Sequence, residues 1–241
     1  MALGVKFIRQ AGIMISKPVT LILIFIYVIQ TTATVFLLFD YVEKEKILER
    51  QQAEIVSLQE EVKTLKEKLQ IFEVIKDFQI GFTDEEVAQI GEVIYAESKR
   101  YSYDPFLLLA MIMTESSFKK GQISNVGAQG LMQIRPFVGK DVAERYDLGW
   151  EGEYPLFRPS FNIRIGCLYL FDLILKFKDV KKALIAYNIG EGALRERISL
   201  GMGLPKLFVS RIKDNYLMLK EKYEDSSDSS NPAPVSGAVN G

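Results

Sequence analysis

The sequence has no histidine and only one cysteine among its 241 residues. Without histidine there can be no Ser-His or Cys-His nucleophile pair and no His-ligated metal site. A single cysteine excludes an intramolecular disulfide and a thiolate metal cluster. Because Cys167 lies in the apolar stretch "IGCLYLFDLIL", we expect a buried structural thiol rather than a reactive one. Any enzyme chemistry is therefore expected to use carboxylates and hydroxyls, with no metal and no cofactor.

Several binding motifs are also missing. We find no phosphate loop, no dinucleotide fingerprint at a strand–helix turn and no calcium loop. Lys and Arg number 30 against 31 Asp and Glu, which gives a formal net charge of −1. Nothing in this balance marks a nucleic-acid-binding protein, so no nucleic-acid partner is expected.

The longest apolar run covers residues 18–39, "PVTLILIFIYVIQTTATVFLLF", and contains no charge in 22 residues. At 1.5 Å per residue this amounts to about 33 Å of helix, enough to cross the hydrocarbon core of a bilayer. We therefore predict a transmembrane helix over 18–40. The alternative is a cleaved signal peptide, because Thr31-Thr32-Ala33 is a tolerable cleavage site. Since the apolar run continues past that site to Phe39, an uncleaved anchor is the better interpretation.

The residues before this run predict its orientation. Lys6, Arg9 and Lys17 are basic and residues 1–17 contain no acid, which favours a cytoplasmic N-terminus. The protein is then expected in the cytoplasmic (inner) membrane as a single-pass protein. Its C-terminal domain would be extracytoplasmic, on the periplasmic side.

Residues 41–78 carry a heptad pattern that predicts a coiled-coil stalk. The two seams consist of residues spaced seven apart, namely Leu48, Ile55, Val62 and Leu69, and Gln51, Leu58, Leu65 and Phe72. In a parallel homodimer Glu61 would face Lys66 of the partner and Lys68 would face Glu73, and both pairs are complementary. The alternative is one amphipathic helix lying on the following domain or on the membrane.

A mostly α domain is expected over residues 82–223. Thr83 and Glu86 form a capping box at the start of one helix, and Asp104 with Pro105 opens the next. Further helices are predicted from 161, over "VKKALIAYN" and from 207, and no convincing alternating strand is found. The tail over 224–241 is polar and rich in Pro, Gly and Ser, so we expect it to be disordered.

Within this domain the stretch "FLLLAMIMTESSF" ends an apolar helix in a carboxylate, Glu115. On a helix Glu115 shares a face with Leu108, Met111 and Ile112. Apolar neighbours disfavour the charged form and raise the pKa of a carboxyl group, which suits a general acid. The alternative is that the helix ends here and Glu115 points to solvent.

Four motifs follow one another along the chain, and the first of them contains this glutamate. They are Glu115-Ser116-Ser117-Phe118, then Ser124 with Gly127-Ala128 and Gly130-Leu131-Met132-Gln133, then Asn162-Ile163 with Gly166, Tyr169 and Leu170, and finally Ala186-Tyr187-Asn188 with Gly190. Over roughly residues 83–215 they resemble the motifs Glu-Ser-x-Phe/Trp, Gly-Ala-x-Gly-Leu-Met-Gln, Asn-Ile…Gly…Tyr-Leu and Ala-Tyr-Asn-x-Gly. These belong to the lysozyme-like lytic transglycosylases of the soluble-lytic-transglycosylase type (glycoside hydrolase family 23).

The resemblance implies a lysozyme-like α-helical catalytic domain behind the transmembrane helix and the stalk. It implies cleavage of the β-1,4 bond between N-acetylmuramic acid and N-acetylglucosamine in peptidoglycan glycan strands, with 1,6-anhydromuramoyl products. Glu115 would act as acid and then as base. The substrate-binding residues that it implies are Ser124, Met132, Gln133, Tyr187 and Asn188, with Met132 expected in the core or the cleft wall rather than in a specific contact.

Two positions depart from the family pattern. Arg135 stands where Met is common after Gln-Ile, and is expected to alter the rim of the cleft. Phe208-Val209 replaces a frequent Tyr-Val pair, which removes a hydroxyl often found near the acid.

Two other functions remain open from the sequence. A goose-type-like muramidase would hydrolyse the same bond with water, and would need a second placed carboxylate. Asp141, Glu144, Asp147, Glu151 and Glu153 lie in polar segments and are interpreted as solvated. The other alternative is a catalytically weak wall-binding assembly protein with a vestigial site.

Overall fold

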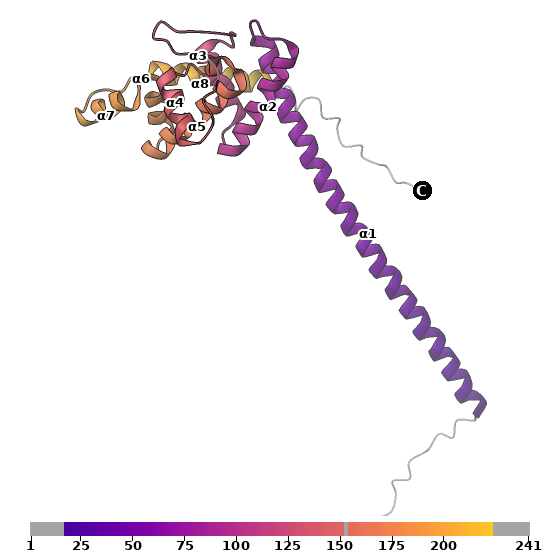
Figure 1. Ribbon diagram of the computed structural model, residues 1–241. Coiled ribbons are helices and arrows are strands. Elements are labelled where there is room, and N and C mark those ends of the chain that lie inside the picture. Colours follow the sequence, from indigo (N-terminus) through magenta and orange to yellow (C-terminus); the bar gives the residue numbers. More distant parts are fainter. Residues whose placement is uncertain (1–16, 152–153, 224–241) are drawn as a thin grey trace, which may run out of the picture. The chain divides into compact units, whose positions relative to one another are not determined.

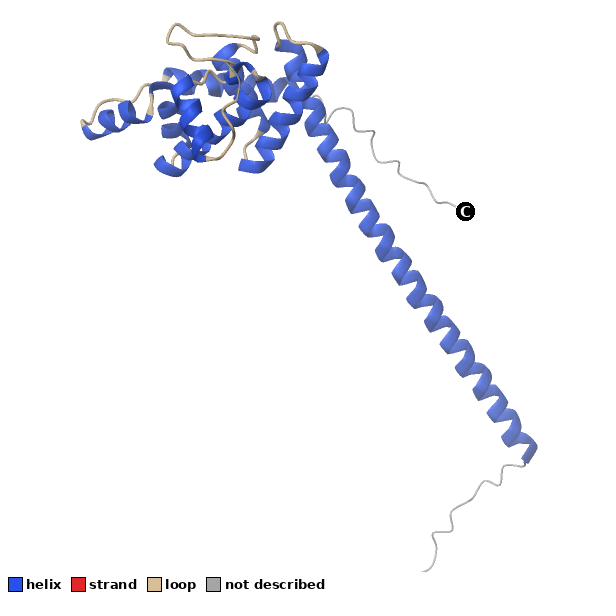
Figure 2. Cartoon of the chain, in the orientation of Figure 1, coloured by secondary structure: helices blue, strands red, loops and turns tan. Residues whose placement is uncertain are grey.

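The computed structural model describes residues 17–151 and 154–223, and in these ranges the chain is helical with no strand (Figures 1 and 2). The helices are α1 (Lys17–Phe78), α2 (Asp84–Tyr101), α3 (Pro105–Ser116), α4 (Pro136–Arg145), α5 (Pro159–Phe177), α6 (Val180–Ile189), α7 (Glu191–Ser199) and α8 (Leu207–Tyr223), with the short 3₁₀ helix η1 (Pro155–Phe157). The predicted mostly α fold is thus confirmed. The basic residues Lys6 and Arg9 and the tail over 224–241 lie outside the described residues.

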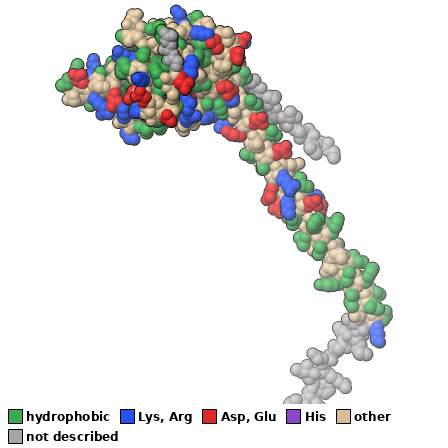
Figure 3. Space-filling view, in the orientation of Figure 1, with side chains coloured by type: hydrophobic (Ala, Val, Ile, Leu, Met, Phe, Trp, Pro, Cys, Tyr) green, Lys and Arg blue, Asp and Glu red, His purple; other side chains and the backbone are tan. Residues whose placement is uncertain are grey.

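The chain divides into two units, residues 1–62 and 63–241. In the first unit, α1 begins as an apolar helix that is long enough to cross a membrane. Apolar side chains cover the visible face of its first part, and charged side chains follow further along (Figure 3). The Thr32 and Thr34 hydroxyls donate hydrogen bonds back to helix carbonyls at 2.8–2.9 Å. These two hydroxyls therefore need no water as a hydrogen-bond acceptor, which suits a helix in lipid.

The last turns of α1 belong to the second unit. Ile71, Val74 and Ile75 are buried, and Gly91 of α2 leaves room for the Ile75 side chain. The compact unit thus includes residues from Lys63, whereas the sequence placed the start of the domain at 82. The physical reason is that the buried residues of α1 lie outside the two heptad seams, although Phe72 of the second seam also packs against the core. Leu65 and Leu69 of those seams remain exposed.

The helix starts that were predicted from capping residues are observed. Thr83 accepts a hydrogen bond from the backbone of Glu86, whose side chain accepts one from the Thr83 backbone, as in a capping box. Asp104 caps α3 through the backbone N–H of Phe106. α3 then buries residues on every face and packs mainly against α8. It is the central helix of the domain, as its composition predicts.

Two helices were not predicted, α4 and α7. α4 buries only Gly139, Val142 and Ala143, and α7 buries only Leu194. So little apolar periodicity gives no clear signal in the sequence. Both helices flank the cavity described below.

Candidate active site

Glu115 lies in the last turn of α3, half-buried. The residues before and after Glu115 fix its position. The preceding Thr114 is buried, and its hydroxyl accepts a 2.9 Å hydrogen bond from the Asn215 side chain of α8. After Glu115 the backbone turns through left-handed conformations at Ser117 and Phe118, with φ values of 52° and 54°. Because the Phe118 side chain is completely buried, this turn is anchored in the core.

The environment of Glu115 favours a protonated carboxyl group. Desolvation raises its pKa from 4.5 to about 7, and the charge of Arg211 on α8 partly opposes this shift. Within the described part of the chain, the Glu115 carboxyl makes no hydrogen bond and no ion pair. A carboxyl group that is half protonated near neutral pH can donate a proton and then accept one.

The loop over residues 122–134 carries the glycine-rich motif. The Ser124 hydroxyl accepts a hydrogen bond from the Ala128 backbone at 3.0 Å. The Gln133 amide nitrogen donates to the carbonyls of Gly130 and Gln122 at 2.8 and 3.2 Å. Ser124 and Gln133, both predicted to bind substrate, therefore also fix the shape of the loop.

Asn162 on α5 holds this loop against the core. Its side-chain oxygen accepts from the Met132 backbone N–H at 2.7 Å, and its amide nitrogen donates to the Gln129 carbonyl at 2.8 Å. A Cβ at Gly130 would lie 2.3 Å from the Asn162 amide nitrogen, and the φ of Gly130 is 77°. Glycine is thus required at position 130 both by space and by backbone conformation.

Met132 lies in the core of the domain and not on the cavity wall. Its side chain is completely buried and lies against Gly166 of α5, where a Cβ would come within 2.5 Å of the Met132 sulfur. Its role in this structure is core packing that sets the distance between the loop and α5.

Tyr187 and Asn188 end α6 beside the same loop. The buried Tyr187 hydroxyl donates a 2.9 Å hydrogen bond to the Met132 carbonyl, and its ring lies 5.2 Å from that of Tyr169. Burial raises the pKa of Tyr187 well above its ordinary value, and the nearby charge of Glu115 raises it further. Asn188 is exposed. The glutamate and the Tyr187-Asn188 pair are thus brought to one region, as the motifs predict.

A cavity of about 720 Å³ opens beside this cluster. Its wall combines loop, α4, α5, α6 and α7 residues: Val126, Gln133, Ile134, Arg135, Phe137, Val138, Asp141, Arg145, Tyr169, Lys176, Tyr187, Asn188, Ile189, Gly190, Glu191 and Gly192. Three predicted site residues, Gln133, Tyr187 and Asn188, line it. Glu115, Ser124 and Met132 do not, although Glu115 is close enough to Tyr187 to influence its pKa.

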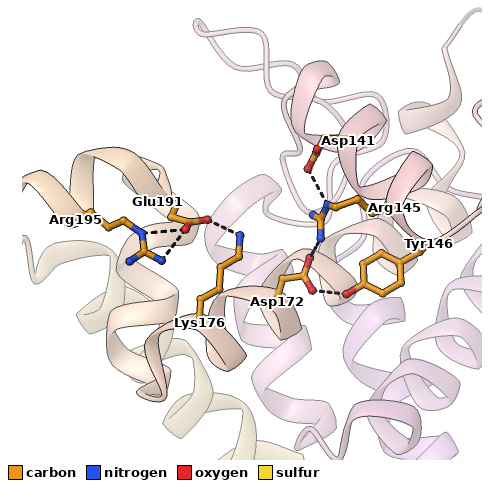
Figure 4. A network of polar contacts seen from close by, with 7 residues as sticks. All are labelled: Asp141, Arg145, Tyr146, Asp172, Lys176, Glu191 and Arg195. Carbon is orange, nitrogen blue, oxygen red and sulfur yellow. Dashed lines mark hydrogen bonds and ion pairs between the residues drawn. The ribbon is translucent and has the colours of Figure 1, made fainter.

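One side of the cavity is held by a network between α4 and α5 (Figure 4). The Arg145 side chain donates to Asp141 at 3.0 Å and also to the buried Asp172, and the Tyr146 hydroxyl donates to Asp172 as well. Asp141 is exposed, in line with its interpretation as solvated, and it also lines the cavity. The i, i+4 spacing of Asp141 and Arg145 was visible in the sequence, whereas the contact with Asp172 spans 27 residues and was not.

A second network joins α5 to α7 on the cavity wall. Glu191 lies between Lys176, at 2.6 Å, and Arg195, at 2.9 Å (Figure 4). The hydrogen bond from Lys176, with that from Arg195, holds the pKa of Glu191 below its ordinary value. Glu191 is thus kept ionised and paired, unlike Glu115.

Comparison with known proteins identifies the family of this domain. Residues 92–207 match the Transglycosylase SLT domain family. A transglycosylase of Enterobacteria phage PRD1 is 37% identical over 104 residues, which cover 42% of this chain and 35% of that protein. Membrane-bound lytic murein transglycosylase C of Mannheimia succiniciproducens is 37% identical over 107 residues, covering 40% of this chain and 30% of the relative. The lytic transglycosylase Slt of Pseudomonas aeruginosa superposes with a TM-score of 0.49 at 23% identity, over 55% of this chain and 24% of that one.

The helical region over 92–207 is therefore a transglycosylase domain of the SLT type. The family resemblance drawn from the four motifs is confirmed. The matched stretch covers about a third of the length of the curated relatives.

Proposed function

We propose that this protein is a lytic transglycosylase that cleaves the β-1,4 bond between N-acetylmuramic acid and N-acetylglucosamine in peptidoglycan. The observation that carries the proposal is the state of Glu115. It is a half-buried carboxyl group with a pKa raised to about 7, it pairs with no cation of the described residues, and it lies beside the motif residues of an SLT domain.

In this mechanism the Glu115 carboxyl group acts first as the acid and then as the base. Protonated Glu115 donates its proton to the glycosidic oxygen as the bond from that oxygen to C1 of the muramoyl sugar breaks. The resulting carboxylate accepts the proton of the muramoyl 6-hydroxyl, whose oxygen forms a bond to C1. A 1,6-anhydromuramoyl end results, no water is consumed, and Glu115 is protonated again. The nucleophile belongs to the same sugar, so its attack has the advantage of an intramolecular reaction.

The remaining site residues position the sugar in this proposal. Gln133 and Asn188 reach the cavity wall and are assigned to polar contacts with the glycan. The Tyr187 hydroxyl donates its hydrogen to Met132, but its oxygen can still accept a hydrogen bond. An N-acetyl N–H of the substrate is a suitable donor. Ser124 contributes by fixing the shape of the loop, because its hydroxyl accepts a hydrogen bond from the Ala128 backbone N–H.

The cavity supports a lyase over a muramidase. A hydrolase with this fold would need a second carboxylate free to activate water. The two carboxylates that line the cavity, Asp141 and Glu191, are paired with Arg145 and with Lys176 and Arg195. The cations lower the pKa of Glu191, and the Asp141 carboxylate is engaged by Arg145, so neither is free to activate water.

Anchoring by α1 completes the proposal. The apolar first part of α1 would form a single-pass anchor in the cytoplasmic membrane, with the SLT domain on the periplasmic side, where its substrate lies. The relatives named membrane-bound lytic murein transglycosylase C support an anchor. The exposed heptad seams would pair two copies in a parallel coiled coil.

Weighing the products of digestion by the full-length protein tests the function. Purified peptidoglycan should yield anhydromuropeptides. Reducing muramoyl ends, which are heavier by one water, would instead establish the muramidase. Binding to the wall material without any cleavage would establish the assembly protein.

A further inference from the structure

The charged residues that line the cavity differ in whether they form ion pairs. Arg145 is shared between Asp141 and Asp172, and Lys176 is paired with Glu191. Arg135 is the exception. Within the described part of the chain it forms no ion pair and no side-chain hydrogen bond, although it lines the same cavity. Its positive charge is therefore available to a ligand.

Arg135 is also arranged beside an aromatic surface. Its guanidinium group lies 4.8 Å from the centre of the Phe137 ring, which is 63% exposed and also lines the cavity. This contact with the ring leaves the N–H groups at the edge of the guanidinium free to donate. At the N-cap of α4 the Arg135 side chain makes no capping hydrogen bond. Among residues 17–151 and 154–223, Arg135 thus has no polar partner that would explain its charge.

We propose that Arg135 and Phe137 form a subsite for a carboxylate-bearing sugar, so that the cavity selects muramoyl residues by their carboxylate. This inference rests on the proposed function and names the part of the substrate that the subsite recognises. A guanidinium group binds a carboxylate through two parallel hydrogen bonds. The exposed Phe137 ring offers an apolar surface to the C–H face of the same sugar. A neutral N-acetylglucosamine oligomer could pack against the Phe137 ring, but it has no carboxylate to bind the Arg135 guanidinium group.

The carboxylate has two sources in peptidoglycan: the lactyl group of a strand without peptide, or the carboxylates of the attached stem. Binding can be measured calorimetrically on full-length protein in nanodiscs, in a Glu115→Gln background that prevents turnover. Four ligands separate the sources. They are peptide-free strands, the same strands with their carboxylates converted to methylamides, stem-bearing strands, and stem-bearing strands with amidated carboxylates.

The expected result is a dissociation constant roughly three- to tenfold higher for an amidated ligand than for its free acid, as for one charge-assisted contact in a partly exposed site. Arg135→Met should remove this difference, so that the free and the amidated ligands bind with the same weak affinity. Arg135→Lys should retain part of it, and raising the salt concentration should reduce it. The pair of ligands that shows the difference identifies which carboxylate is bound.

Lys140→Gln is the matched control, because Lys140 is an exposed cation of α4 that does not line the cavity. It should behave as the parent protein. Equal binding of free and amidated ligands, or a preference that survives in Arg135→Met, would overturn the inference. If the preference holds but the protein with Glu115 releases no anhydromuropeptides, the proposed function fails and the subsite stands.

Discussion

The hydroxyl of Tyr187 donates a 2.9 Å hydrogen bond to the backbone carbonyl of Met132. This contact joins the end of α6 to the loop after α3, across 55 residues of sequence. The Met132 backbone N–H donates to Asn162 of α5. One residue of the loop is thus held by both of its backbone polar groups, and the glycine-rich motif keeps its shape because two other motifs hold it.

Tyr187→Phe should therefore lower stability more than it lowers the chemical rate. It leaves a buried carbonyl without a donor, which costs about 1 to 2 kcal/mol. Urea unfolding should show this loss, while kcat on peptidoglycan should fall less than about tenfold, since no proton is transferred through Tyr187. Tyr169→Phe is the control, because the Tyr169 hydroxyl has no hydrogen-bond partner in the described ranges. Unchanged stability in Tyr187→Phe would show that the contact contributes nothing.

Asn162→Ala should destabilise the domain strongly. The substitution removes two hydrogen bonds from a completely buried side chain and leaves the Met132 N–H and the Gln129 carbonyl unpaired. We expect a loss of about 2 to 4 kcal/mol in the free energy of unfolding. Asn188→Ala removes the same amide from an exposed position and should leave stability unchanged while weakening glycan binding. Equal stability of the two variants would contradict the role assigned to Asn162.

What the sequence predicted depended on local pattern. α3 and its terminal Glu115 were predictable because apolar residues cover the helix on every side and Asp104-Pro105 marks its start. The order of the motifs was enough to assign Tyr187 and Asn188 to the same predicted site as Glu115. The contacts of Arg145 with Asp172 and of Glu191 with Lys176 were not predictable, because only the packed structure brings these α5 residues near. Met132 was placed in the site by its motif, but its burial against Gly166 is a property of the tertiary contact.

We predict that the full chain self-associates through the heptad seams of α1. Ile55 and Leu58 are 48% and 52% exposed in the single chain, so pairing would bury apolar surface. Light scattering of detergent-solubilised protein should give the mass of a dimer, and Ile55→Ser with Leu58→Ser should shift it to the monomer. Val56→Ser alters an exposed apolar residue outside the seams and should not. A monomeric parent protein at high micromolar concentration would rule the coiled coil out.

Stability should depend on pH through Glu115. Its pKa is raised from 4.5 to about 7 in the folded protein, so the folded state binds the proton more tightly than the unfolded state. The contribution of the protonated group is fully present below pH 4.5 and is lost as the pH rises to about 7. Relative to Glu115→Gln, the native protein should therefore become less stable by roughly 1 to 3 kcal/mol between pH 4 and pH 8. A constant difference across this range, measured by urea unfolding, would mean that the carboxyl group is solvated.

Glu115→Gln should abolish glycan cleavage without unfolding the protein. The amide has nearly the size and hydrogen-bonding capacity of a protonated carboxyl group, but it cannot transfer a proton. Each general acid–base role contributes about 10²- to 10⁴-fold, so the loss of both should reduce kcat by at least a few orders of magnitude. In the proposed mechanism Glu115 is protonated at the start of the reaction, so the rate should fall as the pH rises above about 7.

Glu144→Gln is the matched control for this prediction. The Glu144 side chain is 65% exposed, and its contact with Lys140 is long, at 3.8 Å. Its substitution should leave both the rate and the pH profile unchanged. Release of anhydromuropeptides by Glu115→Gln at the rate of this control would mean that another group donates the proton. Among the carboxylates of the cavity wall, Asp141 and Glu191 would then be tested next, although each is paired with a cation.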